Sequence, residues 1–335
     1  MSIKVGIVGF GFIGKMHLSV YLKNPDAEVV TICDLSKDAL KKENLTKGGN
    51  IDLGEIDEKK LNQIAAYSDF DEFLNHDGLD LVDVCLPTYL HCDYTVRALG
   101  KGKHVICEKP MSLTLKEADK MIAAAEKSGK SLFIAHCIRF WPEYVWLKQA
   151  VDENRYGRVG AAIFKRVSPM PTWTWENWII DEKRSGDAAL DLHVHDTDFV
   201  NYLFGKPQEV FSRGAAVVTG GMDMITTQYI YKDVSMVLAI GSWGSPSNYP
   251  FEMAFTVLCE KATIEFSSSK KPTLIVYKAD GSIEHPEVDK ADGYTREIEY
   301  FLNCVKDGKK PTMVTPQDGR FAVEFVLREK KKARS

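Results

Sequence analysis

The sequence lacks several features that would each define a class of protein. No uninterrupted apolar run approaches the roughly 18 to 20 residues of a membrane span. Its 43 basic and 47 acidic residues leave a formal net charge of −4, which offers no electrostatic footprint for nucleic acid or an anionic membrane. Its seven cysteines include no Cys-x-x-Cys pair, and an odd number argues against a disulfide framework. Membrane-spanning, nucleic-acid-binding and disulfide-stapled proteins are therefore excluded.

The N-terminus also lacks the pattern of a secretory leader. The residues after Met1 run straight into the apolar segment 3–8, without a basic region, a hydrophobic region and a small-residue cleavage site. We therefore expect a cytoplasmic protein with reduced cysteines.

Short apolar segments alternate with segments of helical periodicity in the first part of the chain. Segments this short and apolar on both faces are typical of buried parallel strands. The expected strands are residues 3–8, 28–33, 79–86, 104–107 and 131–135, and the expected helices are 12–23, 91–100 and 114–128. The alternation predicts an α/β fold with a doubly wound parallel sheet, the Rossmann architecture, over residues 1–136. The polar segment 46–60 is expected to be a surface excursion.

The pattern changes after residue 136, and a length of 335 residues favours two domains. Strands joined by short turns predict an antiparallel or mixed sheet in a second domain, residues 137–335. The expected strands are 159–167, 210–218, 225–231, 235–239, 251–259 and 262–266, and the expected helices are 141–153, 294–305 and 317–330. The C-terminal helix belongs to this second domain by sequence, with packing back on the first domain as the alternative.

Residues 9–14, Gly9-Phe10-Gly11-Phe12-Ile13-Gly14, match the pattern G-x-G-x-x-G directly after the first expected strand. In a dinucleotide-binding fold the first glycine permits the turn, the second lets the backbone approach a pyrophosphate, and the third allows close helix–strand packing. Asp34 ends the second expected strand, and its carboxylate is suited to the ribose hydroxyls and repels a 2′-phosphate. The pattern favours NAD over NADP, against the alternative of a purely structural turn.

A second cluster ends in Glu108-Lys109-Pro110, after the strand expected at 104–107. Ligands of open α/β sheets bind at the carboxyl ends of the strands, so Lys109 is a candidate to lie near a bound nicotinamide. On its own, a lysine after a strand is more often an ordinary surface charge.

A third cluster contains Asp191, His195 and Asp198, whose i, i+4, i+7 spacing would place them on one face of a helix. A histidine can exchange a proton with a hydroxyl near neutral pH. His193 and His195 would converge as a metal pair only on a strand, and a third ligand is not apparent, so we predict no metal.

Taken together, these residues make the sequence resemble the Gfo/Idh/MocA oxidoreductases, the group of glucose-fructose oxidoreductase and inositol 2-dehydrogenase. The resemblance covers nearly the full length of the chain. It is carried by the glycine motif, Leu86-Pro87-Thr88 with His91, Gly102 to Pro110, Arg139-Phe140-Trp141-Pro142, the 191–198 segment, Tyr294 to Phe301 with Gly308 and Pro311, and the final helix.

The resemblance implies a Rossmann domain, an α/β domain with a large, mostly antiparallel sheet, and an active site between them. It implies a homodimer or homotetramer built on that sheet. Lys109, Asp191 and His195 match the catalytic residues of the family. The remaining positions expected to contact NAD are Gly9, Gly11, Phe12, Ile13, Gly14, Asp34, Pro87, Thr88, His91 and Glu108.

Substrate recognition is expected to involve Arg139, Trp173 and Trp175. The two tryptophans are candidates because indole faces pack well against the C–H faces of sugar rings. The chain departs from the family at His193, where many relatives have glycine, and an imidazole there would narrow the pocket or contact substrate. The tryptophans would equally suit a domain or oligomer contact.

These observations predict an NAD-dependent dehydrogenase that oxidises a secondary hydroxyl of a sugar or cyclitol. His195 would accept the hydroxyl proton, Lys109 would stabilise the oxygen, and Asp191 would orient the substrate. The alternatives are an NAD-dependent glycosidase with transient redox chemistry and a non-catalytic NAD-binding sensor, which the Lys109 and His195 pair disfavours.

Overall fold

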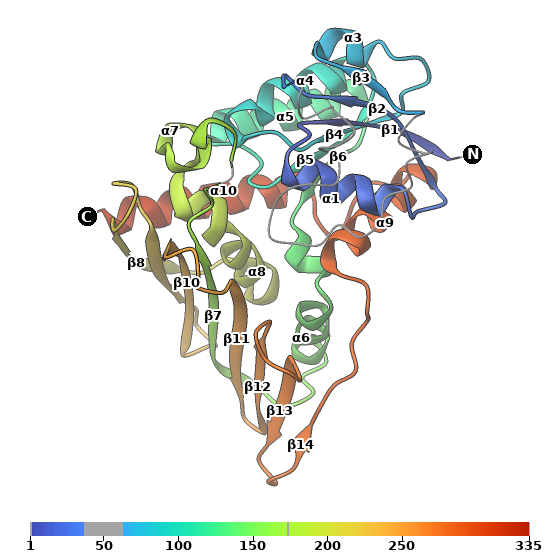
Figure 1. The fold of residues 1–335 in the computed structure, drawn as a ribbon. Helices are drawn as coiled ribbons and strands as arrows, with labels where there is room; N and C mark the ends of the chain where they lie inside the picture. Colours follow the sequence, from blue (N-terminus) through green and yellow to red (C-terminus); the bar gives the residue numbers. More distant parts are fainter. Residues whose placement is uncertain (1, 37–62, 173, 335) are drawn as a thin grey trace. The chain divides into compact units, whose positions relative to one another are not determined.

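The computed structural model describes residues 2–36, 63–172 and 174–334 (Figure 1). Contacts within the chain divide it into two compact units. The first contains the described residues of Met1–Cys137, Trp173–Trp178 and Gly293–Arg320, and the second contains those of Ile138–Thr172, Ile179–Asp292 and Phe321–Ser335. The units are not single continuous segments, and the domain boundary at residue 136 stays a prediction.

The first unit is built on a parallel sheet in the strand order β3-β2-β1-β4-β5-β6 (Figure 1). Its strands are β1 (Ile3–Val8), β2 (Ala27–Cys33), β3 (Ala65–Tyr67), β4 (Leu81–Val84), β5 (His104–Glu108) and β6 (Leu132–Ala135). Every residue of β4 and of β6 is buried, as expected for strands covered on both faces. The doubly wound architecture is confirmed.

Helices connect these strands. They are α1 (Phe12–Tyr21), α3 (Phe70–Leu74), the short η2 (Thr88–Leu90), α4 (His91–Gly100), α5 (Leu115–Ser128) and α9 (Gly293–Lys306). The sequence defines α5 sharply, because Thr114 and Glu117 form a capping box and Gly129 ends the helix at a positive φ of 67°. β3 and α3 were not predicted. The segment expected as a surface excursion, 46–60, lies outside the described residues.

The second unit contains a sheet in the order β14-β13-β12-β11-β7-β10-β9-β8. Its strands are β7 (Val159–Pro169), β8 (Glu209–Ala215), β9 (Met224–Ile230), β10 (Met236–Ser245), β11 (Glu252–Cys259), β12 (Ala262–Ser267), β13 (Leu274–Lys278) and β14 (Ile283–Glu284). β7 and β10 pair in parallel, and the other neighbours are antiparallel. The predicted mostly antiparallel sheet is confirmed, although β13 and β14 were not predicted.

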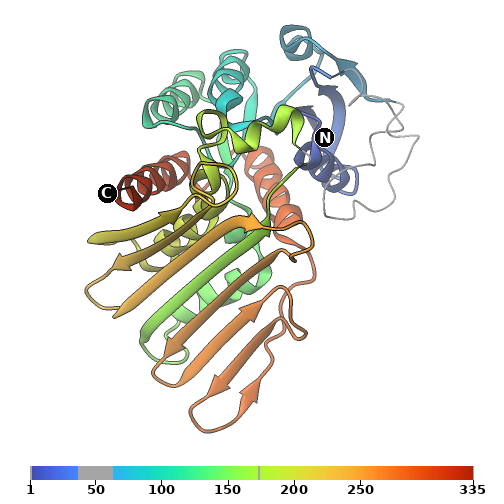
Figure 2. The same ribbon diagram turned by 60° about the vertical axis from the view of Figure 1, so that its left-hand side comes forward.

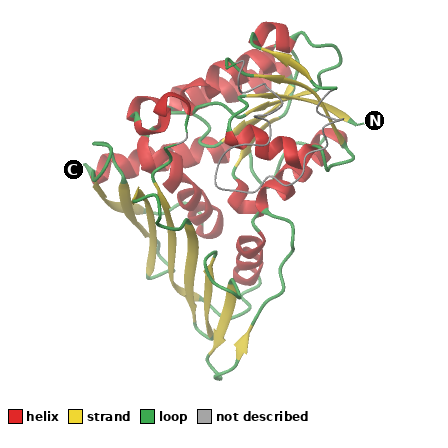
Figure 3. Cartoon of the chain, in the orientation of Figure 1, coloured by secondary structure: helices red, strands yellow, loops and turns green. Residues whose placement is uncertain are grey.

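Helices α6 and α8 pack on one face of this sheet and lie behind its strands in Figure 2. The helical segments from residue 137 onward, other than α9, are η3 (Cys137–Phe140), α6 (Pro142–Asp152), η4 (Trp175–Ile180), α7 (Glu182–Ser185), η5 (Ala189–His193), α8 (Val194–Phe204) and α10 (Pro316–Ala333), drawn with the strands in Figure 3. Tyr144 of α6 is the centre of an aromatic core, with ring centroids 4.8 Å from Phe199 and 5.1 Å from Phe255. This packing fixes α8, which begins directly after the segment containing Asp191.

Among the helices of the described residues, none combines the length and apolar character that crossing a membrane requires.

Candidate active site

The glycine-rich loop joins β1 to α1, and each glycine meets a different steric demand. Gly9 has a φ of +89°, and a Cβ there would lie 2.5 Å from the carbonyl oxygen of Cys85. A Cβ on Gly14 would overlap the carbonyl oxygen of Gly9, whereas one on Gly11 would meet no atom within 4 Å. Packing therefore requires the first and third glycines, and the second keeps the backbone open to an approaching pyrophosphate.

The N-terminus of α1 is also suited to bind a pyrophosphate. Its N-cap is Gly11, which provides no side-chain hydrogen bond to the first turn of the helix. The N–H groups of a helix's first turn lack partners within the helix and favour an anionic ligand together with the helix dipole. The loop therefore fits the pyrophosphate of a dinucleotide.

Asp34 follows β2 and is half-buried beside the loop. Its Oδ2 accepts a hydrogen bond from the backbone N–H of Phe10 at 2.7 Å, and its Oδ1 accepts one from Ser36 at 2.7 Å. The carboxylate thus fixes the glycine loop from the neighbouring strand end, and each oxygen keeps a lone pair for a ribose hydroxyl. Burial lowers the pKa of nearby Lys15, although the charge of Asp34 opposes this shift.

The loops after β4 and β5 are joined by His91. Its Nδ1 lies 2.8 Å from the carbonyl oxygen of Pro110, and its Nε2 lies 2.7 Å from that of Leu86. The ring is 1% exposed, and burial lowers its pKa. His91 therefore holds two loops together, while Pro87 and Thr88 lie in the first of these loops. Contact of these residues with the cofactor stays a prediction.

Lys109 is half-exposed immediately after β5. Its backbone N–H donates to Oε2 of Glu108 at 3.1 Å, so the buried Glu108 side chain folds back on the turn that positions Lys109. The lysine stands at the carboxyl end of a central parallel strand, as the sequence predicted, where ligands of such sheets bind.

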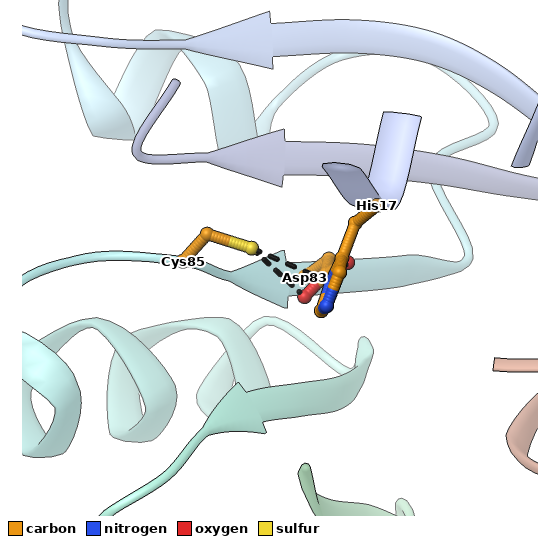
Figure 4. Close-up of side chains that lie close together, drawn as sticks. All are labelled: His17, Asp83 and Cys85. Atoms are coloured by element: carbon orange, nitrogen blue, oxygen red, sulfur yellow. Dashed lines mark hydrogen bonds and ion pairs between the residues drawn. The ribbon is translucent and has the colours of Figure 1, made fainter. Parts of the chain in front are cut away.

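His17, on α1, lies in a buried cluster that sequence analysis did not find (Figure 4). Its Nδ1 lies 2.8 Å from Asp83, and its Nε2 lies 3.4 Å from Glu108. Tyr21 donates to the same Asp83 carboxylate at 2.9 Å, and the Sγ of Cys85 lies 3.6 Å from His17. Burial alone would lower the pKa of His17, but the neighbouring Asp83 carboxyl raises it well above its usual value. The cluster therefore places a buried imidazole, whose pKa is raised, between the side chains of Asp83 and Glu108.

The same side chains place ligand-type atoms close together. Within the described residues, His17, Asp83 and Cys85 form one group whose atoms lie within 4.8 Å of one another, and His17, Glu108 and Glu297 form another. Burial raises the pKa of the Cys85 thiol, which disfavours the thiolate that binds metals. The short hydrogen bond between His17 and Asp83 further favours a proton-holding network.

In the second unit, Asp191 and His195 lie on a segment whose helical geometry changes along its length. Asp191 belongs to the π-helix η5, and His195 lies in the first turn of α8. Both are half-buried, whereas the neighbouring His193, Asp196 and Thr197 are fully buried. π-Helical turns occur frequently at functional sites.

Asp198 has a different role from the one suggested by its spacing. Its carboxylate forms a bidentate ion pair with Arg139, with distances of 2.8 Å to Nε and 2.7 Å to Nη2. Both side chains are almost fully buried, at 2% and 5% exposure. Asp198 is thus buried in an ion pair, whereas Asp191 and His195 keep accessible surface. Arg139 is engaged in this pair, which argues against the predicted substrate contact.

His193 is also buried. Its Nε2 lies 3.2 Å from Glu329 of α10, and the side chain has no exposed surface. On its other side, a Cβ added to Gly241 of β10 would lie 2.8 Å from the His193 Cβ. This enclosure argues for a packing role in place of the substrate contact that the sequence suggested. Trp175 is 47% exposed, and Trp173 lies outside the described residues.

Two family models match most of the chain. The model described as "Oxidoreductase family, NAD-binding Rossmann fold" matches residues 3–136, and the "GFO/IDH/MocA C-terminal domain" matches residues 144–265. The chain belongs to the Gfo/Idh/MocA oxidoreductase family. It carries that family's NAD-binding Rossmann domain, and the resemblance inferred from its motifs is confirmed.

Similar proteins of this family extend over the whole chain. The myo-inositol 2-dehydrogenase of Thermotoga maritima is 26% identical over 98% of this chain and 95% of its own. The 2,7-anhydro-N-acetylneuraminate hydratase of Mediterraneibacter gnavus is 25% identical over 93% of this chain and 82% of its own. The crystal structure of a probable dehydrogenase from Thermotoga maritima has a TM-score of 0.79 and 25% identity, covering 99% and 97% of the two chains.

The sequence of this Gfo/Idh/MocA oxidoreductase carried no local signal for the His17 cluster. His17 lies in a helix that is buried from Gly14 to Tyr21, where it resembles an ordinary core position, and its partner Asp83 is 66 residues away. A buried acid in the middle of an otherwise apolar strand, as at Asp83, is the pattern that would have indicated a partner.

Proposed function

We propose that this oxidoreductase oxidises a secondary hydroxyl of a neutral sugar or cyclitol with NAD. The observation that carries the proposal is the set of accessible proton-handling residues in a family of oxidoreductases: Lys109 at a Rossmann strand end, and half-buried Asp191 and His195 around a π-helical turn. The inositol dehydrogenase among its relatives supports a polyol substrate.

The glycine loop, α1 and Asp34 are suited to hold the dinucleotide, which supplies a hydride acceptor when bound. Its ribose is proposed to use the second lone pairs of Asp34, and the same carboxylate disfavours the 2′-phosphate of NADP. NAD is therefore the proposed cofactor.

The protein's own residues handle the proton and the oxygen. His195 accepts the hydroxyl proton as the carbinol C–H bond breaks and the carbonyl forms. Lys109, as an ammonium, donates a hydrogen bond to the same oxygen and stabilises its developing negative charge. Asp191 accepts hydrogen bonds from neighbouring substrate hydroxyls and so orients the ring. In the reverse direction, His195 returns the proton to the carbonyl oxygen.

The hydratase among the relatives favours a second candidate, a reaction without net oxidation. Here the same residues would take up and return the hydroxyl proton, and bound NAD would serve as a transient hydride acceptor. Elimination or addition at the neighbouring carbon would occur before the hydride is returned. A glycoside would then be cleaved without accumulation of NADH.

NADH absorbance measured with NAD across inositols, aldoses and simple glycosides tests the proposal, with product analysis alongside. NADH formation with a polyol, reduced by roughly 10²-fold in Lys109→Ala and in His195→Ala, is the expected result. Lys103→Ala is a matched control, because this lysine precedes the same strand at its opposite end. Cleavage without NADH would support the second candidate, and binding of NAD without any turnover would support a sensor.

We also propose that the chain forms a homodimer or homotetramer through the sheet of the second unit. The face opposite α6 and α8 carries partly exposed apolar side chains, including Ile163, Leu238 and Ile240. An apolar sheet face is suited to a second copy of itself, with ion pairs such as Lys165–Glu252 on the same face. Light scattering should report an oligomer that Ile240→Lys dissociates, and a wild-type monomer would contradict this.

A further inference from the structure

Two adjacent residues near the end of α10 hold the segment that contains Asp191 and His195. The segment runs from Gly186, which ends α7, through η5 to Thr197 in α8. Asp191 and His195 keep accessible surface, whereas Asp187, His193 and Thr197 are buried and contact α10. Both the segment and this part of α10 belong to the second unit.

Lys330 holds the start of the segment. Its Nζ donates to the carbonyl oxygen of Gly186 at 2.7 Å and lies 3.0 Å from Oδ2 of Asp187. Asp187 has a φ of +62°, and its Oδ1 accepts a hydrogen bond from the N–H of Ala189 at 3.0 Å. The lysine and aspartate side chains are only 9% and 3% exposed. A buried ion pair therefore fixes the left-handed residue from which η5 begins.

Glu329 holds the other end. Its carboxylate lies 3.2 Å from Nε2 of His193, the last residue of η5. It also accepts a hydrogen bond from the Thr197 hydroxyl at 3.1 Å, and that hydroxyl lies 3.1 Å from the Tyr229 hydroxyl of β9. Because His193 is pressed against Gly241 on its other side, the end of η5 is confined between β10 and α10.

The anchored positions bracket the candidate catalytic residues. Asp191 lies between anchors at 187 and 193, and His195 lies between anchors at 193 and 197. A displacement of about 1 Å in a reacting group can cost ~10²-fold in rate. Buried ion pairs contribute little net stability compared with apolar packing. We therefore attribute to these contacts the role of fixing the positions of Asp191 and His195.

We propose that Glu329 and Lys330 are positioning residues that hold η5 and the start of α8 in the orientation from which Asp191 and His195 engage the substrate. The role in catalysis rests on the proposed function, since it takes Asp191 and His195 as the residues that handle substrate. The anchoring itself is independent of the substrate.

Lys330→Met tests the proposal, with Lys331→Met as its control, because Lys331 is the exposed neighbour on the same helix. With NAD and myo-inositol, or the most active polyol of the panel, kcat should fall about 10-fold to 100-fold in Lys330→Met. The dissociation constant for NAD should stay within about twofold, because the loop in the first unit is unchanged. Amide hydrogen exchange in residues 187–197 should be about tenfold faster. Lys331→Met should match the wild type in all three measurements.

A second measurement separates positioning from general stability. In an Asp191→Ala background, Lys330→Met should lower kcat by less than twofold, because the side chain next to the Lys330 anchor at Asp187 is gone. If the double variant loses kcat by the product of the two single-variant factors, the proposal is overturned. If Lys330→Met does not fold, Glu329→Gln takes its place, since it keeps the volume and the Thr197 contact while removing the charge.

The exchange measurement also distinguishes this proposal from the proposed function. If the enzyme turns over no polyol, the proposed function fails, but faster exchange of residues 187–197 in Lys330→Met than in Lys331→Met still supports the anchoring. Equal exchange in the two variants overturns the anchoring, whatever the activity.

Discussion

Each unit of this oxidoreductase buries a histidine against a carboxylate, but the two settings differ in what confines the ring. His17 lies between two acids, 2.8 Å from Asp83 and 3.4 Å from Glu108. His193 has one acid, Glu329 at 3.2 Å, and a glycine of the sheet against its Cβ. The first ring is held mainly by charge, and the second is held largely by shape.

This difference separates two ways of supporting a site. The His17 cluster ties α1, which follows the glycine loop, to β4 and to the strand that ends beside Lys109. A loss of charge there should therefore affect the stability of the Rossmann unit. The His193 contact depends on the missing side chain at Gly241. A methyl group added there should therefore destabilise the second unit more than the loss of a charge.

The largest loss in the free energy of unfolding is expected from Asp83→Asn. It leaves a buried imidazole without its closest carboxylate, and breaking a buried ion pair typically costs about 3–5 kcal/mol. Urea unfolding at neutral pH should show this loss, whereas Asp77→Asn, an exposed change four residues before β4, should alter the free energy of unfolding by less than about 0.5 kcal/mol. Equal stability of the two variants would mean that charge does not hold His17.

A smaller loss is expected from Gly241→Ala, because its Cβ would lie 2.8 Å from that of His193. Overpacking of this kind costs about 1–3 kcal/mol. Gly244→Ala on the same strand is the control, since its Cβ would meet no atom closer than 3.7 Å. The cost of Gly241→Ala should shrink in a His193→Gly background, which removes the opposing atoms. If Gly241→Ala lowers the free energy of unfolding equally in both backgrounds, the strain comes from a contact other than His193.

Local patterns predicted most of the fold because the decisive signals lie within a few residues. The expected helix 91–100 coincides with α4, and the glycine motif follows β1 and opens α1 as its spacing indicated. Short elements such as β3 carry too few residues for a period to be recognised, and β13 follows a turn rich in lysine and serine that masked its start.

The candidate site was predictable as a set of residue types but not as a geometry. The spacing of Asp191 and His195 was interpreted as α-helical, and nothing in the residues between them indicates a π-helical turn. Asp198 and Arg139 pair across 59 residues of sequence, and Glu329 lies 136 residues after His193. Such pairs are decided by tertiary packing, which one sequence does not reveal.

The smallest expected effect is a pH dependence of stability that His17 supplies. Because the folded-state pKa of His17 is raised well above 6.5, the folded protein keeps a proton that the unfolded chain releases. The resulting stability is fully present below pH 6.5 and is lost as pH rises through the folded pKa, at up to about 1.4 kcal/mol per pH unit. Urea unfolding between about pH 7 and pH 8 should show this slope in the wild type and not in His17→Gln. A wild-type slope retained in His17→Gln would show that another group carries the proton, and the contrast between a ring held by charge and a ring held by shape would be lost.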